Sequence, residues 1–307
     1  MEDERLGLSV PVAGMAGLPD LSRAAEVMGW TDAWSMEARA LDAFTPLAAV
    51  AAVTERLRLG TAIVPAFLRP PGVTAMHAAA LAGLAPGRFV LGLGSSTRVV
   101  VEQWHGAPFP DAPLRATREV AERVRRLLAG ERVDGLRLDV PPEDPVPIYL
   151  AALGPRMLRL SGEIAGGVIL FLVGPRALPR VLAQAGAAES VERIFTFPGT
   201  GPDVLAAARR MIVSYALVPY YARSLQRQGL GEEVAAIGAA WQAGDRARAV
   251  GCVSDRMVAE LTLTGSDEQI AGGLAAYRRA GLGTPVLAFP STEEARRMLE
   301  VLAPARR

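Results

Sequence analysis

Short apolar runs alternate along the chain with longer segments in which apolar residues recur every three to four positions. Runs of this length with few charges predict strands of a parallel sheet, and the segments between them predict amphipathic helices. The expected strands cover residues 6–12, 31–37, 57–65, 88–94, 146–153, 166–172, 191–199 and 284–290. Eight strands alternating with helices favour a closed TIM (β/α)8 barrel, with an open doubly wound sheet as the competing architecture.

The interval between the seventh and eighth strands is much longer than the others. Residues 202–281 have a helical pattern but are too many for one helix. We therefore expect a helical insertion after strand seven, at about residues 202–265, packed beside the barrel mouth. A polar segment at residues 131–145 predicts a small hairpin. Because the chain has no linker and no low-complexity tract, we expect a single domain over residues 1–307.

Composition narrows the possible partners. Half of the 307 residues are hydrophobic, which is enough for a sizeable core. A net charge of +1 gives no electrostatic reason to expect nucleic acid. No apolar run reaches the roughly 18 residues that a membrane span needs. The acidic start of the chain and the single cysteine, Cys252, lead us to expect a cytoplasmic protein.

Two features of the residue inventory exclude particular chemistries. All 33 basic residues are arginine, so a Schiff-base lysine is impossible and pyridoxal and class I aldolase chemistry are excluded. The only histidines are His77 and His105, and no paired cysteine motif occurs. We therefore expect no dedicated metal site.

The active site of a βα barrel lies where the strands end, so the residues after each strand are the candidates. Glu37 follows the second strand and is a candidate general acid or base, with an ion pair to a loop arginine as the alternative. Residues 152–156 turn at Gly154 into a helix that begins with Pro155. The free N–H groups of that turn, with Arg156 beside them, favour an anion, although an ordinary turn with a solvated arginine fits equally.

Glycines also end the fourth strand. Gly92 and Gly94 are followed by Ser95, but the third glycine of a dinucleotide fingerprint is missing. Tyr215, Tyr220 and Tyr221 gather around Pro219 in the expected insertion, where they either line a pocket or pack as an aromatic core.

Four segments, in this order, resemble the bacterial luciferase-like superfamily. The first is TAIVP with RPPGVTAMHAAALAGLAPGRFVLGLGSS, at residues 61–65 and 69–96. The others are PLRATREVAERVRRLLAGE at 113–131, VPIYLAALGPRMLRLSGEIAGGVIL at 146–170 and LTGSDEQIAGGLAAYRRAGL at 263–282. The segment GSSTRVVVEQWHG at residues 94–106 is most similar to actinobacterial oxidoreductases that use coenzyme F420, a deazaflavin. The flavin-dependent monooxygenases of the superfamily are more distant.

The resemblance implies a cofactor cleft at the ends of strands three, four and five. In such a cleft the ring system would approach the backbone at Gly92 and Gly94, and Ser95 would bind its polar edge. The resemblance also implies a non-proline cis peptide between Ala62 and Ile63, behind the ring. The amides expected to hold the cofactor phosphate are those of Ala152, Leu153 and Gly154, beside Arg156.

The function implied is hydride transfer between coenzyme F420 and a small organic substrate, in a homodimer. Glu37 is the first choice as proton donor and Tyr215 the second. An FMN-dependent monooxygenase and a non-catalytic barrel are the alternatives. Thr97 and Ala38 replace a glutamate and a histidine of the related sugar-phosphate dehydrogenases, so oxidation of glucose 6-phosphate is not expected. Gly166 replaces an aspartate of the family, so a cofactor site that binds more weakly is a further alternative.

Overall fold

Eight parallel strands close into a barrel in the computed structural model, which describes residues 4–10, 14–37, 39 and 41–303. The last barrel strand pairs with both the first and the seventh, which closes the ring. The predicted TIM (β/α)8 barrel is therefore confirmed. In order around the barrel the strands are β1 (Gly7–Ser9), β2 (Asp32–Ser35), β3 (Arg58–Thr61), β5 (Phe89–Gly94), β6 (Ile148–Ala151), β7 (Gly167–Phe171), β8 (Glu189–Pro198) and β10 (Thr284–Ala288).

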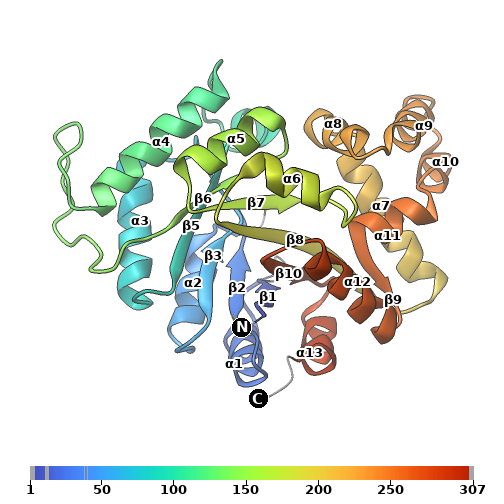
Figure 1. The fold of residues 1–307 in the computed structure, drawn as a ribbon, viewed down its shortest axis with the longest axis horizontal. Helices are drawn as coiled ribbons and strands as arrows, with labels where there is room; N and C mark the ends of the chain where they lie inside the picture. The colour runs from blue at the N-terminus through green and yellow to red at the C-terminus, as the bar shows by residue number, and fades with distance from the viewer. Residues whose placement is uncertain (1–3, 11–13, 38, 40, 304–307) are drawn as a thin grey trace.

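Helices surround this barrel and bury their apolar stripes against it (Figure 1). The fourth is the most amphipathic, with Val124 and Leu127 buried and arginines on its outer face. The helices are α1 (Leu18–Val27), α2 (Phe44–Ala51), α3 (Pro71–Leu84), α4 (Pro113–Leu128), α5 (Pro155–Ile164), α6 (Leu178–Ala185), α12 (Asp267–Arg279) and α13 (Thr292–Val301).

Five further helices and one strand lie between β8 and α12, and Figure 1 shows them gathered on one side in orange tones. They are α7 (Pro202–Ala216), α8 (Pro219–Arg227), α9 (Gly231–Gln242), α10 (Arg246–Gly251), α11 (Asp255–Leu261) and β9 (Thr262–Gly265). The strand was not predicted. Residues 191–195 of β8 pair with β10, and residues 195–198 pair with β9. The long seventh strand thus carries the insertion beside the barrel mouth.

Large side chains fill the middle of the barrel. Trp34, Tyr149 and Val191 point inward and form one cluster with other inward residues of neighbouring strands. Trp34 lies against Gly60, where any side chain would overlap the indole ring. The floor below is polar: Asp32 is fully buried and binds Arg58 at 2.5 Å. The interior of the barrel below the strand ends is therefore filled by side chains.

Three connections differ from expectation or add to it. The expected hairpin at residues 131–145 is reduced to one antiparallel bridge between Val133 and Leu136. A π-helix, Val99–Trp104, occupies the segment after β5 where a loop was expected. A short strand, β4 (Val64–Pro65), adds to the end of β5. No helix within the described residues combines the length and the apolar character that crossing a bilayer requires.

Candidate cofactor and substrate site

A wall of small residues lines one side of the barrel mouth. Gly94 at the end of β5 lies so close to Ala151 and Ile63 that an added Cβ would sit 3.0 Å and 3.2 Å from their side chains. Ala62, Ile63 and Ala151 are only partly buried. The peptide between Ala62 and Ile63 is cis, as expected. The structure therefore brings together the ends of β3, β5 and β6 around one shallow, apolar surface.

Gly92 lies deeper than Gly94. A side chain at Gly92 would overlap the carbonyl oxygen of Thr61 and the side chain of Ile169. Its N–H and carbonyl both bind the Thr61 hydroxyl at 2.8 Å. Gly92 is thus enclosed by its neighbouring strands, and its lack of a side chain serves the close packing of β3 against β5.

Glu37 is held by donors on both carboxylate oxygens. Arg69 binds one oxygen at 2.6 Å, and the Ala43 amide binds the other at 3.2 Å. The Glu37 amide in turn donates to the carbonyl of Ile63 at 3.2 Å. Its side chain is 6% exposed. These contacts fix the Glu37 side chain, and the bond to the Ile63 carbonyl ties the loop after β2 to the end of β3.

A pocket of about 160 Å³ opens beside the end of β6 and the first turn of α5. Ala152 and Leu153 line one side of it, and Arg180 and Arg227 line the other. Arg227 donates to the carbonyl of Leu153 at 2.8 Å, and Arg180 donates to the carbonyl of Arg227 at 2.6 Å. Ala151 packs toward the barrel interior and Ala152 toward the helices, so the wall and the pocket lie on the two sides of the end of β6.

This pocket is strongly cationic. Burial and the like charges of Arg223 and Arg180 lower the pKa of Arg227. Among the described residues, none of these three arginines has a carboxylate partner. Arginines from two helices that converge without a counter-charge are an arrangement suited to a phosphate or carboxylate.

The backbone of the same turn provides further donors. Within the described residues, the N–H groups of Leu153 and Gly154 have no intramolecular acceptor, whereas the Ala152 N–H donates to the carbonyl of Ile169 at 3.0 Å. No neighbour comes closer than 4.0 Å to a Cβ built on Gly154. Arg156 is exposed on the outer side of the turn. Leu153 and Gly154, at the positive end of α5, are thus free to bind an anion.

Four aromatic rings form the opposite side of the mouth. Phe171 of β7 packs edge-on against Tyr215 and Tyr221, with ring centroids 4.9 Å and 5.6 Å apart. Phe195 of β8 lies 5.8 Å from Tyr215. Burial raises the pKa of Tyr215, so its hydroxyl stays protonated at neutral pH. The insertion thus supplies two of the four rings, and Tyr215 and Tyr221 pack as the aromatic cluster that was one of the two alternatives for them.

Inside this aromatic wall lies Arg193, a residue that the sequence analysis did not identify. Arg193 is on the inward face of β8, and its Nε donates to the hydroxyl of Ser9 at 3.0 Å. Its guanidinium lies 4.6 Å from the centre of the Phe195 ring. No carboxylate within the part of the chain that the structure describes pairs with it.

The family model for luciferase-like monooxygenases matches residues 4–284. The chain belongs to the luciferase-like family. A Mycobacterium tuberculosis protein named as a coenzyme F420-dependent oxidoreductase is 29% identical, over 90% of this chain and 92% of that protein.

Solved structures agree with this fold. The coenzyme F420-dependent tetrahydromethanopterin reductase from Methanopyrus kandleri superposes with a TM-score of 0.78 at 22% identity, over 97% of both chains. An F420-dependent secondary alcohol dehydrogenase, solved with an F420–acetone adduct, gives the same TM-score at 17% identity over 99% of both chains.

Two departures from the luciferase-like pattern can now be located. Gly166 precedes β7 and therefore lies at the floor of the barrel, where its N–H donates to the carbonyl of Ile148 at 3.0 Å. The carboxylate that this chain lacks would be remote from the mouth. Thr97 accepts a hydrogen bond from the Val100 N–H at 3.2 Å and so helps to begin the π-helix.

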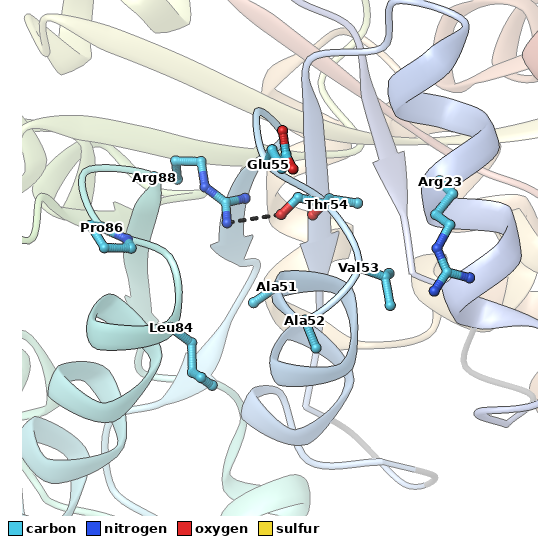
Figure 2. A pocket seen from close by; sticks show the side chains of 9 residues that line it. All are labelled: Arg23, Ala51, Ala52, Val53, Thr54, Glu55, Leu84, Pro86 and Arg88. Carbon is cyan, nitrogen blue, oxygen red and sulfur yellow. Dashed lines mark hydrogen bonds between the residues drawn. The ribbon is translucent and has the colours of Figure 1, made fainter.

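A wider hollow of about 740 Å³ lies at the other end of the barrel, between the ends of α2 and α3 (Figure 2). Figure 2 shows the Arg88 guanidinium reaching to Thr54 from the opposite wall. The Arg88 guanidinium donates to the carbonyls of Leu57 and Thr54, at 2.9 Å and 3.1 Å. In βα barrels this end supports stability and the strands' carboxyl ends carry the chemistry, so we place the candidate site at the mouth.

Proposed function

We propose that this luciferase-like protein is a coenzyme F420-dependent oxidoreductase that transfers a hydride between the deazaflavin and a small organic substrate. The observation that carries the proposal is the cluster of Arg180, Arg223 and Arg227, which has no carboxylate partner among the described residues, at the same end of the barrel as the small-residue wall. The flat wall suits a ring system, and the cationic pocket suits the anionic side chain attached to that ring. The similarity to relatives named as F420-dependent supports the same cofactor.

The residues present fit such a cofactor at two places. Ala62, Ile63, Gly94 and Ala151 would contact the ring, with Ser95 at its polar edge. The amides of Leu153 and Gly154 would bind the phosphate together with Arg227. Leu153 and Gly154 follow Ala151 by two and three residues, at most about 7–10 Å along the chain. When bound, coenzyme F420 supplies or accepts the hydride.

Reduction of a carbonyl-type substrate also needs a proton, and the chain offers two candidate donors. The Tyr215 hydroxyl lies at the mouth among the aromatic rings and stays protonated at neutral pH because burial raises its pKa. Glu37 is occupied by Arg69 and the Ala43 amide. We therefore assign proton transfer to Tyr215 and infer that Glu37 positions the end of β3 through Ile63.

A fluorescence titration with coenzyme F420 tests the proposal. Wild-type protein should bind it, and Arg227→Met should bind about 10- to 100-fold more weakly, the loss expected for a hydrogen bond to a charged group. Arg115→Met is the matched control, because Arg115 lies on exposed α4 and pairs with Glu119 at 2.7 Å. An affinity that is unchanged in Arg227→Met would contradict the assigned anion pocket.

The second candidate is an FMN-dependent monooxygenase, favoured by the family model, which is named for monooxygenases. FMN also carries a phosphate, so the same pocket would accept it. Titration of the same proteins with FMN decides between the two cofactors. A protein that binds neither cofactor at concentrations far above micromolar would indicate the non-catalytic alternative.

We also infer a homodimer through the first half of the barrel. The support is an apolar stripe on α3, where Val73, Met76 and Leu84 are 38%, 57% and 54% exposed. Light scattering of the purified protein measures the mass directly, and Met76→Glu should shift a dimer to the monomer mass. A wild type that runs as a monomer would contradict the inference.

A further inference from the structure

We propose that Arg193 binds a carboxylate of the substrate, so that the substrate class is a small organic acid with a flat apolar body. This inference deepens the proposed function and rests on it. It starts from one observation: inside the barrel mouth an arginine has aromatic neighbours, a hydroxyl partner and no counter-ion among the described residues.

The position of Arg193 follows from the alternation of β8. Val191 points into the barrel and packs in the central cluster, so Arg193 and Phe195 point inward at successively higher levels. Arg193 lies opposite Phe171 on β7 and opposite Val286 on β10. Its side chain therefore lies level with Phe171 and one layer below Phe195.

The energetics of that position argue against a purely structural role. Burial lowers the pKa of Arg193, and only the nearby Tyr215 and Tyr221 counteract this shift. The side chain is only partly buried, and no carboxylate among the described residues neutralises its charge. Its hydrogen bond to Ser9 uses Nε, and within the described part of the chain the two terminal nitrogens have no hydrogen-bond partner. Those two nitrogens are the pair that binds a carboxylate in bidentate fashion.

The surroundings specify the rest of the ligand. Phe171, Phe195 and Tyr215 offer ring faces and edges, and Phe195 itself stacks on the guanidinium at 4.6 Å. Arg39 adds a second positive charge at the rim, where it lies 5.1 Å from the Trp104 ring. A planar acid would thus place its carboxylate on Arg193 and its apolar body between the rings and the small-residue wall.

The buried arginine of the barrel floor provides the contrast. Arg58 binds Asp32 at 2.5 Å, Glu189 at 2.6 Å and the Thr284 hydroxyl at 2.9 Å. All its charge is satisfied within the protein. Removing Arg58 should therefore destabilise the fold, whereas removing Arg193 should leave it about as stable as before, because no ion pair among the described residues is broken.

Isothermal titration calorimetry with benzoate and with benzamide, its neutral isostere, tests the assignment. Each probe is titrated into the protein with and without saturating coenzyme F420. Wild type should bind benzoate at least about tenfold more tightly than benzamide, as expected for a charge-assisted contact. Arg193→Met should lose that preference, Arg193→Lys should retain part of it, and Arg227→Met should retain all of it.

Thermal denaturation of the same proteins completes the test. Arg193→Met should melt no lower than wild type, and Arg58→Met should melt several degrees lower. Equal affinity of wild type for the two probes, no binding of either, or a preference that survives in Arg193→Met overturns the proposal. The proposal is also overturned if Arg193→Met melts at a lower temperature than wild type. It is overturned too if Arg193→Met loses binding of coenzyme F420 and keeps its preference for benzoate. Failure of wild type to bind coenzyme F420 counts against the proposed function alone, because the benzoate comparison stands without it.

Discussion

Glu192 should make the stability of this protein fall as the pH rises, and replacing it by glutamine should abolish that dependence. Glu192 is on the outward face of β8 and is 1% exposed. Its Oε1 accepts the Val173 N–H at 2.8 Å, while Oε2 has no partner in the described chain. Burial raises the pKa of this carboxyl to about 8, against 4.5 for an ordinary glutamate, and the Val173 N–H only partly offsets that rise.

The sign follows from the two protonation states. Between pH 4.5 and 8 the unfolded chain has released this proton and the folded protein retains it. Stability therefore falls by about 1.4 kcal/mol for each pH unit in that window and levels off above pH 8. The full loss is on the order of 5 kcal/mol. Among the residues that the structure describes, no basic group faces Glu192. Its titratable neighbour is Tyr277 of α12, whose hydroxyl donates to the carbonyl of Glu260 at 3.1 Å.

Urea denaturation followed by tryptophan fluorescence at pH 5, 6.5 and 8 measures the effect. Glu192→Gln keeps an acceptor for Val173 but buries an unpaired amide, which costs about 1–3 kcal/mol at every pH. The variant should be less stable than wild type at pH 5 and more stable at pH 8. Glu119→Gln, on exposed α4, is the control and should differ from wild type by a constant amount. A constant difference for Glu192→Gln as well would refute the reasoning.

Three further changes test the floor, the wall and the mouth of the barrel. Arg58→Met should destabilise the fold by about 3 kcal/mol in urea denaturation, because Asp32 is left buried without its main partner; wild-type stability would contradict this. Gly94→Ala should fold and bind coenzyme F420 about tenfold more weakly, because its new Cβ intrudes on the wall. Gly92→Ala should not fold, because its new Cβ would overlap the Thr61 carbonyl. If both variants fold, or neither does, the difference in depth between Gly92 and Gly94 is contradicted. Tyr215→Phe should lower turnover about 100-fold or more with cofactor affinity unchanged; full turnover would exclude proton transfer by its hydroxyl.

The barrel was predictable because each strand and each helix carries its own signal in the sequence. Runs such as residues 88–94 are apolar on both faces, as strands of a parallel barrel must be. The four-residue strand β9 directly follows the helix α11 and has no turn residue before it, so its pattern merges with that helix. Pairing with the second half of β8, a tertiary contact, makes it a strand.

The site was less predictable because its charges come from distant elements. The sequence offered the turn at Gly154 as an anion site or an ordinary turn, and it gave no sign that Arg180 and Arg227 reach this turn from α6 and α8. Glu37 and Arg69 lie 32 residues apart and meet only once β2 and β3 are paired. Loop residues of this kind have no periodicity that would reveal a partner.

Neighbouring charges on β8 show most clearly what a strand pattern leaves open. Glu192 and Arg193 are adjacent and must point to opposite sides of the sheet. Since apolar layers flank a barrel strand on both sides, alternation alone does not tell which charge faces the interior. The structure puts the arginine inside, where a ligand can neutralise it, and the glutamate outside, where it can be neutral only by holding its proton. The two neighbours therefore affect the protein differently. Arg193 favours the binding of an anion in the mouth, and Glu192 makes the folded protein most stable at a pH at which its carboxyl is protonated.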